Sequence, residues 1–593
     1  MTPIRFRVIL AEPEKHRVRI EATFHGVGEI SDVRLLLPVW SPGSYMVREY
    51  AQFLSRLQVT GDDGRQRSSR KVDKTSWKVD CRDTNSIHVS YEVYGHDLGV
   101  RNNHIDGTHA FLTPTAVFLY PETRLTDAIE VEVVSPEGWK VFTQLERPVD
   151  AHDFFSAVDF DELYDSPIEV GPHPCFEFEA AGAKHTVAIW GRGNYDVERL
   201  KRDMPALVET NAAVFGGKVP YEHYLTILLL TDGVYGGLEH RRSTALMFPR
   251  HDFCGSKGSL DVPISDDKYL GFLALFAHEH FHTWHVKRIR PVALGPFDYQ
   301  RENYTRDIWS IEGITSYYND LTLLRAGRIQ PVKFLEFLAD QIKKLDGIPG
   351  RLAQSLEESS FDAWIRLYRA HENNLNSTVS YYLKGQIVAA MLDVFLCEAS
   401  GGAKGLDDVM KFLWQHHSKE RGYPEAKFDE IVFEATGIEV ATQFDTWVRR
   451  AEELDYEGVL ALAGLTLKKS HGKDPAGPWI GVKARAQGDR LVIDQVSSDG
   501  PSSGFLSPGD ELVAIDGFKV SATNLDERLR IAGIGNAPVF HVFRYAELVD
   551  VPIIIGEEPP TKYEILADPL AASGALAVRK SWLGTDTIEE IKQ

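Results

Sequence analysis

Three observations predict a multidomain α+β protein, in which a β domain precedes a mostly helical domain and a small β module. The chain has 593 residues, and a single hydrophobic core rarely grows beyond about 250–300 residues. Its first part alternates apolar and charged residues with the period of two that is typical of β-strands. Long apolar stretches of helical character follow, and short strand patterns return near the C-terminus.

The charge and the cysteines exclude several classes of protein. The 86 acidic and 65 basic residues give a formal net charge of −21, which repels nucleic acid and anionic membrane surfaces, so we expect neither as a partner. The N-terminus lacks the apolar region of a secretory signal, and no apolar run approaches the roughly 20 residues of a membrane span. None of the four cysteines, Cys81, Cys175, Cys254 and Cys397, lies in a CxxC pair. The sequence therefore predicts a soluble, cytoplasmic protein.

Residues 1–171 are predicted to form the N-terminal domain, an antiparallel β-sandwich or saddle. The clearest strand patterns are Ile4–Val8, Val18–Ala22 and Ile87–Tyr91. Turn residues such as those of Gly61–Gly64 separate the strands.

Residues 172–467 are predicted to form the second domain. A strand pattern at Tyr224–Leu230 gives way to helical stretches between about residues 267 and 462. No proline interrupts the chain between Pro349 and Pro424, which favours long helices there.

The C-terminal part is predicted to contain a β module at residues 468–558. Its first residues, 468–478, are polar and rich in Gly and Pro, and we interpret them as a linker. Residues 559–593 are Ala-rich and then charged, which leaves a docking helix and a frayed tail as alternatives.

A metal-binding motif of the HExxH type follows the apolar stretch Tyr269–Leu275, which predicts a buried helix. His278 and His282 stand one helical turn apart on one face, so both imidazoles can reach a single ion. Glu279 lies beside that face, where it can accept a proton from a water molecule without binding the metal itself. Histidine ligands in this pattern predict one Zn²⁺ per chain.

A zinc site of this kind needs a third protein ligand. His285 returns to the same helix face, but a straight helix places it about 10 Å along the axis from His278. The next apolar helical segment, Trp309–Tyr318, carries one carboxylate in its middle. We therefore predict Glu312 as the third ligand.

These strings resemble the glycyl aminopeptidase family, a group of PDZ-bearing gluzincin metallopeptidases related to the aminopeptidase N family. The resemblance rests on HEHFHTWHVKRIRP (His278–Pro291), on WSIEGITSYY (Trp309–Tyr318) and on WSPGSYMVR (Trp40–Arg48). It implies a thermolysin-like catalytic domain, bound Zn²⁺, and removal of small N-terminal residues, Gly and Ala above all, from peptides with a free N-terminus. His285 stands where the family leads us to expect Asn, and we interpret it as a change either in the hydrogen bonds around the metal ligands or at the surface.

The resemblance also implies substrate-binding and catalytic residues. Gly236, Gly237 and Glu239 match the family's substrate-edge string, in which the acid binds the α-amine of the substrate. Tyr382, with Tyr381 as the alternative, matches the tyrosine that donates a hydrogen bond to the developing oxyanion.

The segment Ser502–Val520 resembles part of a PDZ domain, with Trp479–Val482 as its carboxylate-binding loop. Such a domain binds a C-terminal peptide as an added strand.

The sequence leaves two alternatives to an aminopeptidase open. One is an endopeptidase that receives unfolded chains from the PDZ domain, and the other is a non-catalytic adaptor that binds peptides.

Overall fold

The structure is a computed structural model that describes residues 2–148, 153–253, 267–418, 422–472 and 476–588. The chain forms two compact units, each of which is described by itself. The first unit contains residues 1–304 together with the short segments 325–329 and 413–423, and the second unit contains the remaining residues.

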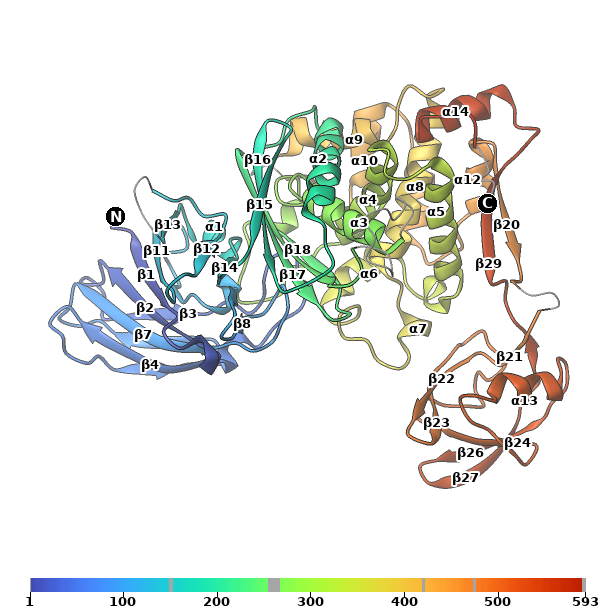
Figure 1. Ribbon diagram of the computed structural model, residues 1–593, viewed down its shortest axis with the longest axis horizontal. Helices are drawn as coiled ribbons and strands as arrows, with labels where there is room; N and C mark the ends of the chain where they lie inside the picture. The colour runs from blue at the N-terminus through green and yellow to red at the C-terminus, as the bar shows by residue number, and fades with distance from the viewer. Residues whose placement is uncertain (1, 149–152, 254–266, 419–421, 473–475, 589–593) are drawn as a thin grey trace. The chain divides into compact units, whose positions relative to one another are not determined.

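The N-terminal part of the first unit is a β-sandwich-like domain whose largest sheet has the strand order β13-β11-β1-β2-β7-β4. Figure 1 shows several of these strands side by side in blue. Their bounds are β1 (Ile4–Ile9), β2 (Arg17–His25), β4 (Leu54–Gly61), β7 (Ser86–Tyr94), β11 (Ile129–Val134) and β13 (Phe154–Ala157). Buried residues alternate with more exposed ones along β1 and β2, which confirms the strands predicted from the period of two.

One detail of the predicted sheet is wrong. We expected an antiparallel domain, but β1 pairs with β11 in parallel, with Ile4 opposite Ile129. The alternating pattern of a strand determines which face it buries and not the direction of its partner. The sequence pattern therefore could not reveal this pairing.

Two four-stranded sheets complete the β-sandwich-like domain, with the orders β10-β3-β6-β5 and β12-β14-β9-β8. The strands of the first are β3 (Asp32–Leu36), β5 (Ser69–Lys71), β6 (Ser76–Asp80) and β10 (Tyr120–Pro121). Those of the second are β8 (His104–Ile105), β9 (Ala110–Leu112), β12 (Lys140–Phe142) and β14 (Ile168–Gly171). A short helix, α1 (Phe160–Tyr164), is capped at its N-terminus by Asp159, whose side chain accepts a hydrogen bond from the Glu162 amide.

A five-stranded mixed sheet follows, with the order β15-β16-β17-β19-β18. Its strands are β15 (Cys175–Ala180), β16 (Ala183–Trp190), β17 (His223–Thr231), β18 (Gly236–Glu239) and β19 (Ser243–Pro249). The predicted strand Tyr224–Leu230 is the fully buried centre of β17. The short edge strand β18 runs antiparallel to β19 and carries the predicted substrate-edge string.

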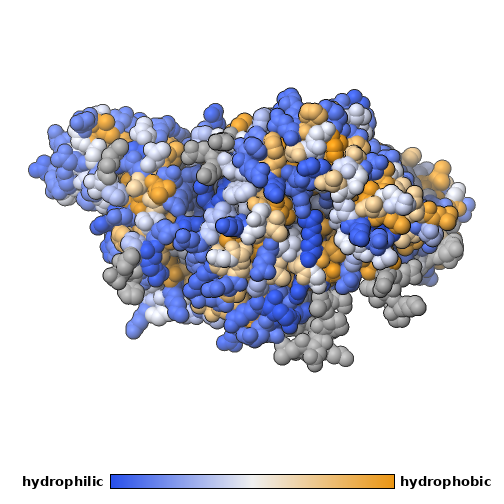
Figure 2. Space-filling view, turned by 90° about the horizontal axis from the view of Figure 1, so that it is seen from above, coloured by the Kyte–Doolittle hydropathy of each residue, from blue (hydrophilic) through white to orange (hydrophobic). Residues whose placement is uncertain are grey.

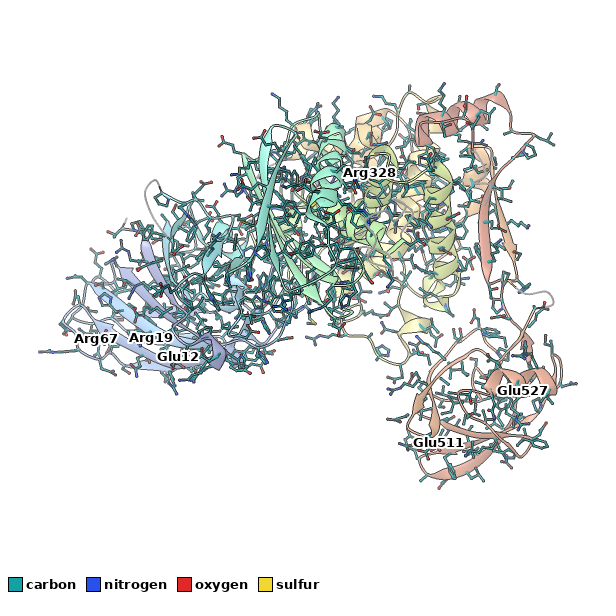
Figure 3. The ribbon with its side chains drawn as sticks, viewed as in Figure 1. Glu12, Arg19, Arg67, Arg328, Glu511 and Glu527 are labelled. Atoms are coloured by element: carbon teal, nitrogen blue, oxygen red, sulfur yellow. The ribbon has the colours of Figure 1, made fainter. Side chains whose placement is uncertain are left out.

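Two helices of the first unit, α2 (Val197–Val214) and α3 (Asp267–Phe281), contact each other and are joined by a buried carboxylate. Asp203 on α2 accepts a hydrogen bond from Tyr269 on α3, with an O–O distance of 2.9 Å. The guanidinium of Arg328, labelled in Figure 3, lies 2.6 Å from the same carboxylate. These bonds fix the first turns of the helix that carries the predicted metal ligands.

The predicted helical region is confirmed for the described residues between 305 and 462. Its α- and π-helical segments are η5 (Trp309–Gly313), α4 (Ile314–Arg325), α5 (Pro331–Asp346), α6 (Leu356–Phe361), α7 (Asn374–Ser377), α8 (Tyr381–Ala399), α9 (Leu406–His417), α10 (Phe428–Thr436), α11 (Ala441–Phe444), η8 (Asp445–Arg449) and α12 (Tyr456–Leu462). Among the described residues, one helical stretch, Asn374–Ala399, is long and apolar enough to cross a membrane. However, 78% of its apolar window is buried inside the protein, which is typical of a core helix.

The C-terminal β module, residues 476–558, contains the sheet β22-β23-β24-β26-β27, with β25 paired to β24, and the helix α13 (Leu525–Ala532). Its strands are β22 (Val482–Gln487), β23 (Arg490–Val496), β24 (Glu511–Ile515), β25 (Phe518–Lys519), β26 (Val539–Arg544) and β27 (Glu547–Pro552). Buried aliphatic residues and Phe540 form a core of its own.

The segments that flank this module are ordered and paired. β20 (Leu465–Ser470) pairs with β29 (Lys562–Ala567), so the first residues of the predicted linker are strand rather than linker; residues 473–475 lie outside the described residues. After β29 comes helix α14 (Ser573–Leu583), where the indole of Trp582 donates a hydrogen bond to the Tyr317 hydroxyl over 2.8 Å. Of the two alternatives for this tail, the docking helix is therefore the one that forms.

Hydrophilic residues cover much of the face shown in Figure 2, and apolar residues appear among them in patches. Such mixing is ordinary for the surface of a globular protein.

Candidate active site

The two predicted metal ligands of the first unit, His278 and His282, lie at the end of α3. Their Nε2 atoms are 3.0 Å apart. Two nitrogens that each lie about 2.0–2.1 Å from a tetrahedral zinc ion are separated by about 3.3 Å. The pair therefore fits a single zinc ion with only a small adjustment of the rings.

A backbone carbonyl orients His282. The Nδ1 atom of His282 lies 2.8 Å from the carbonyl oxygen of His285. Since a carbonyl can only accept, Nδ1 carries the proton and Nε2 keeps the lone pair that a metal requires. The side chain of His285 is fully buried, which excludes the surface, the second of our two interpretations of this residue, and its backbone carbonyl is what orients His282.

The histidine between the two ligands, His280, faces the protein core. Its Nε2 lies 2.6 Å from the Tyr221 hydroxyl, and its Nδ1 lies 3.2 Å from the Asn211 amide nitrogen. Burial lowers the pKa of His280 well below its ordinary value, so the ring is neutral. His280 thus fixes the rotation of α3 about its axis, which aims His278 and His282 in the other direction.

Glu279 lies directly against the edge strand β18. Its side chain is buried, and a Cβ atom placed on Gly237 would collide with its carboxylate. The carbonyl oxygen of Gly237 accepts a hydrogen bond from the Arg101 guanidinium over 2.9 Å. Glycine at position 237 is therefore required by the close approach of the carboxylate.

Glu239, at the end of β18, is buried beside Glu279 and His282. One ligand atom from each of these three residues lies within 4.8 Å of the other two. Among the residues that the structure describes, Glu239 Oε1 has no hydrogen-bond partner. A buried carboxylate oxygen of this kind is costly unless a cation or a donor joins it. The arrangement therefore favours binding of a positively charged group next to Glu279.

The loop that carries Gly43 also lies against Glu239. Gly43 has a φ of +87°, and a Cβ atom placed on it would collide with the Glu239 carboxylate. Trp40 anchors this loop by donating a hydrogen bond to the Asp298 carbonyl over 2.8 Å. The string Trp40–Arg48 thus forms one wall around the carboxylate.

We did not predict that Gly43, although it lies in the string WSPGSYMVR, or Arg101 would lie at this site. The turn sequence Ser-Pro-Gly around Gly43 gave a signal, but its contact with Glu239 depends on the tertiary fold. Nothing in the sequence around Arg101 distinguishes it from the other arginines.

In the second unit, Glu312 lies in η5, a π-helical segment that leads into α4. Its side chain is 3% exposed. The next residue, Gly313, packs on Gly385 of α8, and a Cβ atom on Gly313 would lie 2.5 Å from the Gly385 Cα. Both glycines are required because the backbones of the two helices touch at this point, and π-helical turns are frequent at functional sites.

The two tyrosines that we considered for the oxyanion begin helix α8, which is capped by the Ser380 side chain. Tyr381 is fully buried, whereas Tyr382 is partly exposed. The Tyr382 hydroxyl lies 3.2 Å from that of Tyr368. Two effects raise the pKa of Tyr382 well above its ordinary value, burial most strongly and the nearby charge of Glu312 second. The phenol therefore keeps its proton.

The structure thus brings the predicted residues together in two sets. The first unit gathers a pair of imidazoles and two carboxylates at one end of α3, and the second unit gathers a buried carboxylate and a protonated phenol. Donors of these types in the HExxH pattern define a metallopeptidase.

Comparisons with known proteins identify the family. Residues 5–172 match the model of the Peptidase M61 N-terminal domain, and residues 271–388 match that of M61 glycyl aminopeptidase. These two segments of the chain are thus similar to the two domains of M61 glycyl aminopeptidases, and the protein is a peptidase of the metallo-aminopeptidase type. No curated protein matches it.

One solved structure is similar over nearly the whole chain. A crystal structure of an aminopeptidase N family protein from Idiomarina loihiensis is 28% identical, with a TM-score of 0.89, and the match covers 98% of this chain and 100% of that chain. An M1 zinc metallopeptidase from Deinococcus radiodurans is 14% identical, with a TM-score of 0.46, over 76% of this chain and 94% of that chain.

Proposed function

We propose that this protein is a zinc-dependent aminopeptidase that removes small N-terminal residues, Gly and Ala above all, from peptides. The observation that carries the proposal is the buried Glu239 carboxylate beside Glu279 and His282. The preference for small residues is supported by the description of the family as glycyl aminopeptidases.

One Zn²⁺ per chain would be held by His278, His282 and Glu312. The separation of the two histidine nitrogens and the fixed tautomer of His282 support the first two ligands. The burial of Glu312 and its place within the matched residues support the third. When bound, the zinc ion would polarise the scissile carbonyl and make a water molecule more acidic.

Glu239 would bind the α-ammonium group of the substrate. An ion pair with a buried carboxylate is strong, and a blocked N-terminus would leave the carboxylate without its partner. The nearest peptide carbonyl would then lie close to Glu279.

Glu279 would act as the general base and then as the general acid. It would accept a proton from the attacking water and pass it to the leaving amine. Gly237 supports this role, because its lack of a side chain lets the carboxylate lie at the edge of β18.

Tyr382 would donate a hydrogen bond to the oxyanion that develops on the carbonyl oxygen. Its partial exposure favours it over the fully buried Tyr381, because the donor has to reach the substrate. A donor that acts only as charge develops lowers the barrier without tightening substrate binding.

We also propose that the C-terminal β module is a PDZ-like domain that binds C-terminal peptides. The segment Trp479–Val482 joins β21 (Pro478–Trp479) to β22, and Gly481 between the two strands has a φ of +73°, which turns the backbone there. A labelled peptide with a free C-terminal carboxylate should bind the full chain at least about tenfold more tightly than its amidated form. Equal binding would contradict this part of the proposal.

The two alternatives differ in their support. An endopeptidase would have no need of a buried carboxylate at position 239, and a non-catalytic adaptor does not agree with the match to a peptidase family.

To test the proposal, we would remove all metal with a chelator and add back zinc. Activity should return at one equivalent, and Glu279→Gln should bind zinc equally well but lose turnover. Loss of zinc in this variant would contradict the assigned role of Glu279.

A further inference from the structure

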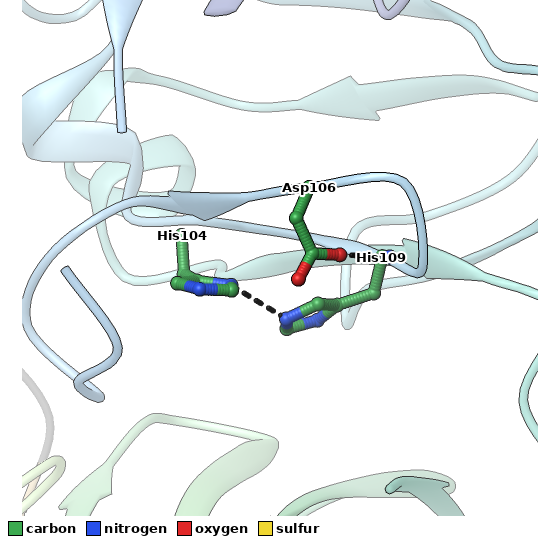
Figure 4. Close-up of side chains that lie close together, drawn as sticks. All are labelled: His104, Asp106 and His109. Atoms are coloured by element: carbon green, nitrogen blue, oxygen red, sulfur yellow. Dashed lines mark hydrogen bonds between the residues drawn. The ribbon is translucent and has the colours of Figure 1, made fainter. Parts of the chain in front are cut away.

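A second group of potential metal ligands lies in the β-sandwich-like domain, at the hairpin between β8 and β9. His104 is the first residue of β8, and His109 directly precedes β9. Figure 4 shows both rings and the Asp106 side chain converging on one side of this hairpin. The Nδ1 atom of His104 lies 2.8 Å from the Nε2 atom of His109.

Asp106 completes the group. One ligand atom from each of His104, Asp106 and His109 lies within 4.8 Å of the other two. The carboxylate is held in place through its Oδ1, which accepts hydrogen bonds from the backbone amides of Thr108 and His109 over 2.7 and 3.1 Å. The tight turn therefore fixes all three side chains relative to one another.

A buried carboxylate from another strand orients His109. Glu169 on β14 lies with its Oε1 2.9 Å from His109 Nδ1 and 2.5 Å from His173 Nε2. Both Glu169 and His109 are fully buried. A carboxylate that accepts from Nδ1 leaves the lone pair on Nε2, which faces His104. This is the arrangement by which metal sites orient a histidine ligand.

Packing holds the His109 ring rigidly. The indole of Trp190 stacks on it, with ring centroids 4.0 Å apart and planes 19° apart. His104 is 7% exposed, and Asp106 is more exposed, so an ion can reach the hairpin from solvent. Two imidazoles and one carboxylate form a donor set that suits zinc and its neighbours in the first transition series, with a fourth position left for water.

We propose that His104, Asp106 and His109 form a second divalent transition-metal site, and that Glu169 positions His109 for it. The hairpin begins three residues after Arg101, which donates a hydrogen bond to Gly237 at the candidate active site. A bound ion would therefore also stabilise the segment that supports the edge strand β18.

The experiment uses the full chain, without an affinity tag, in the background His278→Ala/His282→Ala, which removes two ligands of the first site. The protein is stripped with a chelator, equilibrated with Co²⁺ or Zn²⁺, and separated from free metal by gel filtration. We expect one equivalent of bound metal, and with Co²⁺ the visible absorption bands of a low-coordinate site with nitrogen ligands.

Two variants test the ligands, and one serves as a matched control. His104→Gln and Asp106→Asn should each lower the affinity for Co²⁺ by at least about tenfold, while circular dichroism shows an intact fold. His16→Gln is the control, because His16 contacts the same hairpin through the Ile105 carbonyl but is not one of the proposed ligands. It should bind metal as the background protein does.

Absence of bound metal in the background protein would overturn the proposal and leave the cluster as a hydrogen-bonded network. Binding that neither ligand variant weakens would place the ion elsewhere and would also overturn it. Loss of metal from His16→Gln to the same extent as from His104→Gln would likewise overturn the proposal. Because His278 and His282 are absent throughout, these outcomes do not depend on the proposed peptidase mechanism.

Discussion

Gly43 lies so close to the carboxylate of Glu239 that no side chain fits between them, although the two residues are far apart in the sequence. The contact joins the β-sandwich-like domain to the edge strand β18 and closes one side of the proposed amine site.

We predict that Gly43→Ala weakens the proposed amine site. The substitution places a Cβ against Glu239 and strains a backbone with a φ of +87°, at a cost of about 1–3 kcal/mol. The value of kcat/KM for free-amine substrates should fall about 10- to 100-fold, as measured by steady-state kinetics. Gly64→Ala is the matched control, because Gly64 has a φ of +74° and open space around its Cβ position. An equal loss in both variants would mean that strain alone, and not the contact with Glu239, causes the effect.

We predict that Tyr382→Phe lowers kcat about 10²- to 10³-fold with little change in KM, because loss of one oxyanion donor costs about 2.7–4 kcal/mol. Zinc content should not change. Tyr381→Phe is the control, since its fully buried ring keeps its packing. If Tyr381→Phe carried the loss and Tyr382→Phe did not, the assignment of the two tyrosines would be reversed.

We predict that Asp165→Asn destabilises the first unit at neutral pH. Burial alone would raise the pKa of Asp165, but Lys287, 2.6 Å away, and His240 outweigh it and hold this pKa well below its ordinary value. Breaking such a buried pair costs about 3–5 kcal/mol.

The sign of the pH dependence follows from the lowered pKa of Asp165. The stabilisation is present above the unfolded-state pKa of about 3.9 and is lost as the pH falls towards the lower folded-state pKa. The Tm difference between the wild type and Asp165→Asn should therefore be largest near pH 7 and shrink below about pH 4. A difference that grows in acid would contradict the ion pair.

We predict that Trp582→Ala destabilises the second unit by about 3–5 kcal/mol, because it empties a buried site of a large ring and removes the hydrogen bond to Tyr317. Thermal unfolding checks the loss. Leu570→Ala is a suitable control in the same tail, because Leu570 is 89% exposed. An unchanged Tm for Trp582→Ala would mean that α14 does not dock as described.

Much of this protein could be predicted from local sequence. The strand patterns of β1, β2 and β7, the buried helix α3 and the donors at 278, 279 and 282 depend on periodicity and on spacing along one helix. The roles of Glu239 and Tyr382 needed the family resemblance, because a single acid or tyrosine carries no local signal.

The remaining features depend on contacts between distant segments. The parallel pairing of β1 with β11, the crossing at Gly313 and Gly385, and the approach of Gly43 to Glu239 have no counterpart in any short stretch of sequence. The histidines of the β8–β9 hairpin likewise gain meaning only when the fold brings Glu169 to them. The cytoplasmic location and the natural peptide substrates stay predictions.

The most direct test of the proposed function is hydrolysis by the purified, zinc-loaded protein of Ala- and Gly-arylamides with free amines, compared with their N-acetylated forms. We predict cleavage of the free-amine substrates only, because the acetyl group removes the charge that Glu239 would bind. Equal cleavage of the acetylated substrates, or cleavage of internal peptide bonds alone, would contradict an aminopeptidase with an amine anchor at Glu239.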